Sequence, residues 1–259
     1  MSQTEVDWQY GYGPDGAALL RYGLGEREGR PWADQLEVLD PRADLATAVA
    51  YVRTELAGWV VSGPVELGEE LVRQGATVLR HGHTMRRELA DAPPPAEGWE
   101  AWARTPLRDG FRAVACDRGA AALVPATLAA FGPGHPDHRP EEAGDDQPAV
   151  QRLAELLAGE IIGPLLPSSA LVVDDTDRVV AGAVLTDWDG LPWIASVFRD
   201  PALGYPGLGR DLLRRAVGEV ALAGGNAVGL AVTEGNRARR LYEEMGFTAT
   251  GTSLTVVVP

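Results

Sequence analysis

The sequence predicts an α/β (α+β) protein built in two parts. Over residues 111–259, apolar runs of strand length alternate with segments of helical periodicity, in the order β-α-α-β-β-β-α-β-α-β. A glycine-rich turn at residues 204–209 joins one of these strands directly to a helix. Three successive prolines precede the region and favour an extended spacer. We therefore divide the chain into a smaller α/β domain (1–90), a Pro-rich linker (91–110) and a main domain (111–259).

The elements of the smaller domain follow from their apolar periodicity. Residues 1–30 are rich in glycine, tyrosine and charge and show no clear period. Apolar residues recur at helical spacing over 44–56, with Asp44 placed as an N-cap. The other expected elements are two strands, a helix ended by a glycine and an extended segment, at 35–39, 58–61, 65–73 and 76–89. This order resembles that of the last stretch of the chain, 228–259, and the two stretches can be aligned with one gap.

The first part of the main domain contains strands and two helices. Residues 110–116 fit a first strand, and three further strands joined by Asp-rich turns are expected at 169–174, 179–186 and 193–198. A first helix is expected over 120–131, interrupted near Pro125, and a second over 150–162. The intervening loop, 134–147, consists of turn formers and acids.

A strand, a glycine turn and a helix N-terminus follow one another after residue 193. The apolar run 193–198 is followed by Asp200-Pro201 and by the turn 204–209, and a helix with one apolar face begins near Leu208. Glycines let the backbone approach a ligand closely, and the free N–H groups of the first helical turn attract anions. This arrangement predicts a phosphate or pyrophosphate site.

The glycine turn alone does not identify the ligand. The dinucleotide fingerprint needs a third glycine, but Leu212 stands where it would lie. A P-loop needs a lysine, and all 23 basic residues of this chain are arginines. The segment that follows the helix therefore decides the interpretation.

The following segment carries a second motif. A short strand, 227–232, leads into a helix that begins after Asn236 and contains the pattern N-x-A-x-x-L-Y-x-x-x-G-F, from Asn236 to Phe247. Together with Gly207 and Gly209, this pattern resembles the GNAT family of N-acetyltransferases over roughly residues 111–259. Two positions depart from the family pattern: Gly204 stands where Gln or Arg is usual, and Ala238 lies one place early.

The resemblance implies a fold, a donor and a set of site residues. The fold is a mixed central sheet flanked by helices, in which the fourth and fifth strands separate so that the pantetheine arm of acetyl-CoA lies between them. Tyr242 would protonate the leaving thiolate, although a core aromatic is the alternative, and Asn236 would cap its helix and contact the arm. The remaining acetyl-CoA contacts would be Val197, Phe198 and Arg199 along the arm, and Gly204, Tyr205, Pro206, Gly207, Leu208, Gly209 and Arg210 around the pyrophosphate.

Other polar residues of the sequence have ordinary explanations. Asp187, Asp189 and Glu160 are candidate general bases, but each also fits a solvated surface acid, and a water chain could serve instead. The histidine pairs, one at 81 and 83 and one at 135 and 138, lack the further ligands of a metal site. We expect exposed histidines in strands or loops and no bound metal, with a role for the second pair in the acceptor pocket left open.

Composition narrows the class of partner. A net charge of −14 argues against nucleic acid, no apolar run is long enough for a membrane span, and one cysteine excludes an internal disulfide. We expect a cytoplasmic enzyme that acetylates a small-molecule or peptide amine, with no membrane partner. The alternatives are a catalytically inactive acetyl-CoA-binding sensor or interaction protein, and an N-terminal half that forms a homodimer. That half is either a degenerate copy of the same fold, as in tandem acetyltransferases similar to mycothiol synthase, or an unrelated cap.

Overall fold

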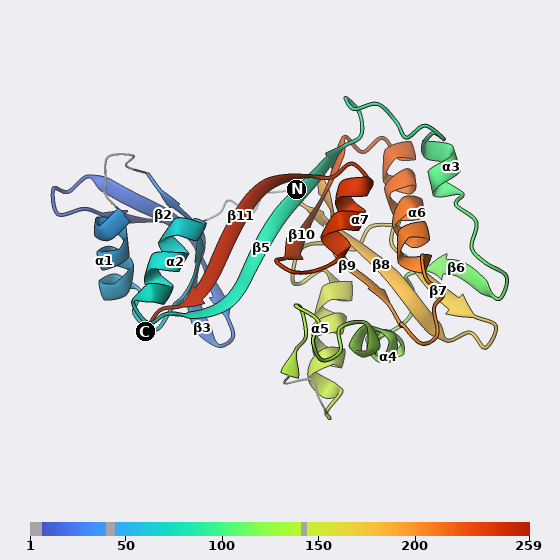
Figure 1. The fold of residues 1–259 in the computed structure, drawn as a ribbon, viewed down its shortest axis with the longest axis horizontal. Helices are drawn as coiled ribbons and strands as arrows, with labels where there is room; N and C mark the ends of the chain where they lie inside the picture. Colours follow the sequence, from blue (N-terminus) through green and yellow to red (C-terminus); the bar gives the residue numbers. More distant parts are fainter. Residues whose placement is uncertain (1–6, 40–44, 141–143) are drawn as a thin grey trace. The chain divides into compact units, whose positions relative to one another are not determined.

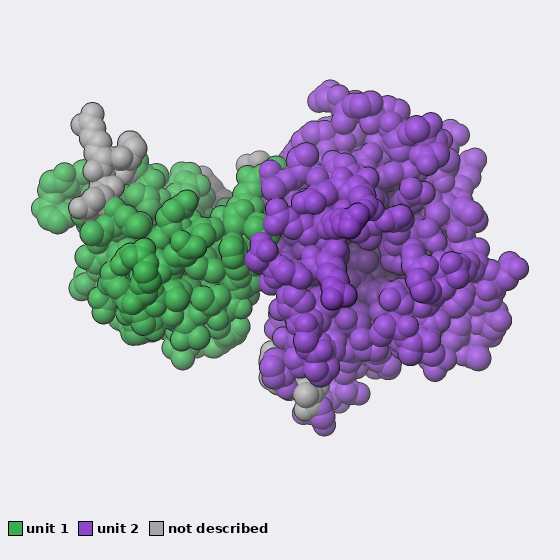
Figure 2. Space-filling view, in the orientation of Figure 1, with its two compact units in different colours: residues 1–83, 250–259 green, residues 84–249 purple. Residues whose placement is uncertain are grey.

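The computed structural model describes residues 7–39, 45–140 and 144–259, which form two compact units. Unit 1 comprises Met1–His83 with Thr250–Pro259, and unit 2 comprises Thr84–Ala249 (Figure 2). Among the helices of the described residues, none combines the length and the apolar character that crossing a bilayer requires.

Unit 1 is a sheet covered by two helices (Figure 1). Its strand order is β1-β2-β3-β4-β11, in which only β3 and β4 are parallel. The apolar core lies between this sheet and the helices α1 and α2. The elements are β1 (Trp8–Tyr12), β2 (Ala18–Arg27), β3 (Arg30–Val38), α1 (Leu45–Glu55), β4 (Val60–Gly63), α2 (Val65–Arg73), β5 (Thr77–Glu88) and β11 (Thr248–Val257).

Most predicted elements of unit 1 are present. Helices α1 and α2 occupy the segments expected to be helical, and β5 is the extended segment, while the predicted cap Asp44 lies outside the described residues. The stretch without a clear period contains β1 and β2. Their period of two is hidden because the ladder is irregular, with register shifts between Gly11 and Tyr12 and between Arg21 and Gly23.

Unit 2 is a sheet with a different helical layer on each face. Its strand order is β5-β10-β9-β8-β7-β6. Strands β6 to β9 pair antiparallel with one another in this order, and β9 pairs parallel with β10. Along β7, Val172 packs with α6 residues, whereas Leu171 and Val173 pack with α4 and α5 residues. Because side chains alternate across a strand, α6 and the α4–α5 pair cover opposite faces. The elements are α3 (Trp99–Ala103), β6 (Phe111–Ala115), α4 (Ala120–Ala130), α5 (Gln147–Ala158), β7 (Ala170–Asp174), β8 (Val179–Trp188), β9 (Leu191–Arg199), α6 (Leu208–Leu222), β10 (Ala227–Thr233) and α7 (Ala238–Glu244).

Two helices of unit 2 differ from the prediction. Helix α4 continues through Pro125, so the expected interruption is absent and the proline removes only one N–H donor from the ladder. Helix α5 begins and ends earlier than the predicted 150–162, because Pro148 lies in its first turn and Gly159 ends it in the left-handed region (φ 81°).

The units divide the chain at positions other than the predicted 1–90, 91–110 and 111–259. Much of the expected linker is structured, because α3 packs closely on α6. A Cβ at Gly218 would lie only 2.4 Å from the backbone nitrogen of Ala103, so glycine is what permits this approach. In addition, Arg215 donates to the Thr105 carbonyl at 2.8 Å. At the other end, β11 contributes Leu254 and Val256 to the core of unit 1.

The two units repeat one order of elements. The series β1-β2-β3-α1-β4-α2-β5 matches β7-β8-β9-α6-β10-α7-β11, and the corresponding strands pair in the same senses. The last strand of each series is exchanged: residues of β11 pair with β4 in unit 1, while β5 neighbours β10 in unit 2.

A local signature accompanies this repeat. Glu28-Gly29 and Asp189-Gly190 form matching hairpin turns in which all four residues have positive φ. A Pro-Trp pair follows each turn, and its tryptophan begins the parallel pairing, Trp32 with Val60 and Trp193 with Gly229.

Candidate active site

Strands β9 and β10 are paired only near their beginnings. The pairing joins Trp193 with Gly229 and Ile194 with Leu230. Beyond it, β9 continues to Arg199, still paired with β8 on its other side, and β10 continues to Thr233. The edge of β9 that faces β10 is therefore without a strand partner over its last residues, in the part of the chain that the structure describes. This is where an opening between the fourth and fifth strands was expected.

Three predicted contact residues lie along this edge. Val197 packs partly buried against the α6 side of the sheet, and Phe198 is buried on the α4–α5 side. The Arg199 guanidinium turns back and donates from Nη1 to the Gly204 carbonyl at 2.8 Å. The backbone of all three residues is held in position by the ladder with β8.

A buried aspartate shapes the turn after β9. Asp200 is 8% exposed, and its Oδ1 accepts the N–H groups of Ala202 at 2.8 Å and Leu203 at 3.2 Å. A Cβ built on Gly204 would lie 2.8 Å from Cγ of Arg199 and 3.0 Å from Leu208. The departure from the family pattern at Gly204 thus has a steric reason, because Arg199 occupies the space that a side chain would need.

The N-terminus of α6 is open to a ligand. Gly207 precedes the helix with φ 100°, a conformation that favours glycine. Cβ atoms built on Gly207 and Gly209 would meet nothing within 4 Å. Since the first N–H groups of a helix have no partner within it, this bare backbone can accept an anion. Leu208 is fully buried and fixes the helix start in the core.

Two side chains stabilise the backbone from Gly207 to Arg210 at the start of α6, which we call the cradle. The Tyr205 hydroxyl donates to Asp211 at 2.7 Å, and burial, followed by this bond, raises the pKa of Tyr205 to about 12. Arg210 pairs with Glu244 of α7 at 2.6 Å, which ties the start of α6 to the end of α7. Pro206, which lies within the glycine turn between Tyr205 and Gly207, has no N–H of its own.

Tyr242 points from α7 into the apolar core of unit 2. Its ring is 9% exposed and lies 5.9 Å from that of Phe247. Burial, with a smaller contribution from the charge of Asp137, raises the pKa of Tyr242 to about 12. Within the described residues its hydroxyl has no hydrogen-bond partner. The phenol is therefore protonated at neutral pH and free to donate.

Asn236 has two partners. Its Oδ1 accepts the N–H of Ala238 at 2.9 Å, so it caps the start of α7, and its Nδ2 donates to Asp137 at 3.0 Å. Asp137 also accepts a short hydrogen bond from the Thr233 hydroxyl. Sequence reasoning missed Asp137 because it treated the loop as turn formers and acids. The available signal was its position within His135-Pro-Asp-His138.

The two histidines of this loop stabilise its shape. His138 donates from Nδ1 to the Phe131 carbonyl at 2.8 Å, and Nδ1 of His135 accepts the N–H of Asp137 at 3.1 Å. The ring of His135 also stacks edge-on against Phe131. These local bonds account for the pair within the described chain.

The candidate bases lie away from the opening. Asp187, near the end of β8, accepts the N–H of Gly190, and Asp189 is exposed in the hairpin turn that follows, whereas the opening is at the end of β9. Glu160 is exposed, just after α5. The structure does not bring these three carboxylates together with Tyr242.

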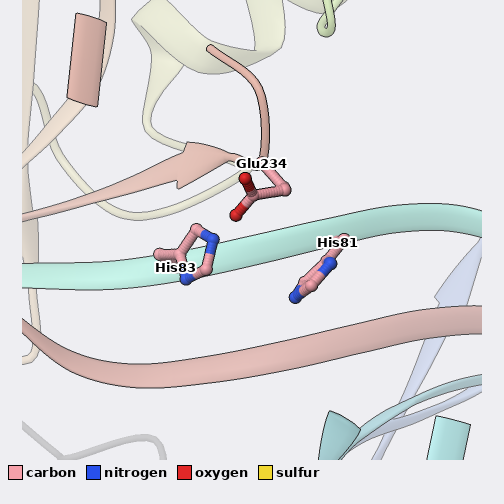
Figure 3. A group of neighbouring side chains, drawn as sticks. All are labelled: His81, His83 and Glu234. Carbon is pink, nitrogen blue, oxygen red and sulfur yellow. The ribbon is translucent and has the colours of Figure 1, made fainter. Parts of the chain in front are cut away.

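The first histidine pair was expected to be exposed, which is wrong. His81 and His83 lie on the same strand, β5, with ring centres 5.2 Å apart (Figure 3). His83 is buried and its Nδ1 is 3.0 Å from the Thr252 hydroxyl of β11, a neighbour that only the folded sheet supplies. Glu234, also labelled in Figure 3, belongs to unit 2.

Comparisons with known proteins show which family part of the chain resembles and which folds the chain shares. Residues 131–247 match the model of the acetyltransferase (GNAT) family. A search of the curated proteins found no match to the sequence.

Solved structures resemble nearly the whole chain. A GCN5-related N-acetyltransferase from Sphaerobacter thermophilus is 18% identical with a TM-score of 0.65, over 98% of this chain and 81% of that one. A GCN5-related N-acetyltransferase from Kribbella flavida is 20% identical (TM-score 0.53; 96% and 88% covered). A tandem GNAT protein from the clavulanic acid biosynthesis pathway is 15% identical (TM-score 0.59; 93% and 79% covered). The predicted fold class is thus confirmed.

Proposed function

We propose that the protein is an acetyl-CoA-dependent N-acetyltransferase, because residues 131–247 match the model of the acetyltransferase (GNAT) family. The acceptor would be a primary amine of a small molecule or peptide, which attacks the thioester directly in a ternary complex. One observation carries this proposal: the unpaired end of β9 leads to the bare N-terminus of α6. This combination suits a donor with an extended arm and a pyrophosphate.

The backbone would bind the donor. The free edge of β9 offers N–H and C=O groups to an amide-containing arm, as a neighbouring strand would. At the start of α6, the backbone of Gly207, Gly209 and Arg210 would offer N–H groups to the pyrophosphate, together with the positive end of the helix dipole. The N–H of Leu208 is already donated to the Tyr205 carbonyl at 3.1 Å. The β8–β9 ladder and the Asp200 turn hold these groups in place before the donor arrives, so that little ordering is needed on binding.

Transfer needs one proton donor near the sulfur. The amine nitrogen bonds to the acyl carbon, the carbon–sulfur bond breaks, and the sulfur takes the proton of the Tyr242 phenol. The amine loses its extra proton to water, and solvent restores that of Tyr242. Tyr242 suits this role because its hydroxyl is protonated at neutral pH and not engaged with a described residue.

A matched pair of variants at Gly209 tests the binding site. Gly209 lies inside α6, has no positive φ, and has open space beside it, so a side chain there enters the cradle without straining the fold. Gly207 is less suitable, because its φ of 100° makes any substitution a change in folding as well. We expect Gly209→Leu to block the phosphate and Gly209→Ala to be tolerated, since both residues favour a helix over glycine.

The measurement is calorimetric titration with acetyl-CoA, using NADH as a control nucleotide. Loss of two charge-assisted hydrogen bonds of about 1.5 kcal/mol each weakens binding about 100-fold. Equal affinity of Gly209→Leu and the wild type would reject the site. Tight binding without release of CoA across a panel of amines would instead favour the inactive acetyl-CoA-binding sensor.

A further inference from the structure

Asp137 links three parts of unit 2 that are distant in sequence. It lies in the α4–α5 loop, and its two carboxylate oxygens accept from Thr233 at the end of β10 and from Asn236 just before α7. Its side chain is 34% exposed, and the nearest basic atom recorded for it, Nδ1 of His135, is 3.8 Å away. That nitrogen accepts the N–H of Asp137, so it carries no proton in this arrangement.

The contact with Asn236 fixes the start of α7. Both ends of the Asn236 amide are used, Oδ1 for the cap on Ala238 and Nδ2 for Asp137, so the amide has one orientation. Helix α7 has only seven residues, and Tyr242 is the fifth of them. Any change at the cap is therefore transmitted to Tyr242 within about one turn.

The charge of Asp137 also reaches Tyr242. It is the one charged group, among the described residues, that raises the pKa of this phenol after burial itself. At the same time, both oxygens of Asp137 are already bonded to Thr233 and Asn236. The carboxylate thus favours the protonated phenol through its charge, while its hydrogen bonds go to Thr233 and Asn236.

From this geometry we propose that Asp137 is a positioning residue for acetyl transfer: it fastens the α4–α5 loop to β10 and α7, and holds Tyr242 ready as the proton donor. The inference rests on the proposed function. It assigns a role to a residue whose side-chain hydrogen bonds go to Thr233 and Asn236, and it explains why the loop carries an acid at this position.

The kinetic test uses Asp137→Asn alone and combined with Tyr242→Phe. Asp137→Asn keeps the shape of the side chain but removes the charge and one acceptor. We expect kcat to fall about tenfold or more, with acetyl-CoA affinity changed less than about threefold. If Asp137 acts through Tyr242, its substitution should have little further effect when Tyr242→Phe is already present. Independent, multiplicative losses would overturn the proposal.

A control and a second readout separate this idea from the proposed function. Asp145→Asn changes another acid of the same loop, whose Oδ1 accepts a local N–H from Gln147, and it should leave kcat unchanged. If the wild type turns over no amine, the proposed function fails, but the tyrosinate absorbance still reports on Asp137. The phenol signal assigned by difference with Tyr242→Phe should ionise at lower pH in Asp137→Asn, and an unshifted signal would overturn the positioning role.

Discussion

The two buried tyrosines of unit 2 allow catalysis and stability to be separated. Tyr205 and Tyr242 belong to the same apolar cluster, but the Tyr205 hydroxyl donates to Asp211 at 2.7 Å, whereas that of Tyr242 has no described partner. Removing a hydroxyl costs stability mainly through the bond it made. We therefore expect Tyr205→Phe to lower the free energy of unfolding by about 1 kcal/mol and Tyr242→Phe to change it by less than about 0.5 kcal/mol.

The kinetic effects should have the opposite order. A general acid contributes roughly 10²- to 10⁴-fold to rate, so Tyr242→Phe should lower kcat at least about 100-fold, equivalent to about 2.7 kcal/mol of activation free energy. Tyr205→Phe leaves the cradle backbone in place and should change kcat less than about threefold. Release of the CoA thiol measures turnover, and urea unfolding measures stability. Equal turnover of Tyr242→Phe and the wild type would show that the phenol is not the proton donor.

The raised pKa values of the Tyr205 and Tyr242 phenols also predict how the free energy of unfolding depends on pH. Their pKa values of about 12 in the folded protein exceed the ordinary value of ~10 for the unfolded chain. As the pH rises past ~10, the unfolded chain releases these protons first, which favours unfolding. The stability from the raised pKa values is complete below pH ~10 and is lost between pH ~10 and 12. Urea unfolding across this range should show the loss, and Tyr242→Phe should reduce it.

Three further outcomes are expected. Calorimetry should give one acetyl-CoA per chain, because the position between β3 and β4 that corresponds to the opening between β9 and β10 is filled. Leu36 is buried there, and a Cβ on Gly63 would lie 3.3 Å from it. A ratio of two acetyl-CoA molecules per chain would contradict this. Arg87→Ala should lower the free energy of unfolding by about 2 kcal/mol, since the guanidinium lies 4.6 Å from the ring centre of Trp102. An unchanged urea midpoint would show that this contact does not stabilise the fold. Cys116, whose pKa burial raises to about 11, should react slowly with iodoacetamide at pH ~8 until urea is added, whereas fast labelling of the folded protein would place the thiol in solvent.

The last strand of the chain, β11, leaves unit 1 discontinuous in sequence. Residues 250–259 complete the sheet of unit 1, so unit 1 is built from two separate pieces of chain, whereas unit 2 is the continuous piece 84–249. This explains why a division at the prolines of the linker does not match the structure. A boundary in composition marks where the chain is exposed, whereas a compact unit is defined by which strands pair.

Local signals of the sequence determined much of the site. The helix with an apolar face that begins at Leu208 and the cap at Asn236 each depend on residues close together in sequence, and both are present as expected. Helix α2 likewise occupies the predicted 65–73. Periodicity and capping are properties of neighbouring residues, so one sequence is enough to find them.

Tertiary structure alone decided the long-range contacts. Asp137 reaches Asn236 across 99 positions of sequence, and no local pattern links a loop acid to a distant cap. Helix α3 depends on the close approach at Gly218, and the placement of β11 beside β4 depends on strand register. Such contacts join residues that are distant in sequence, so they form only when the sheet is assembled. Their stability comes from the burial of side chains and from the register of paired strands, and neither is a property of one segment alone.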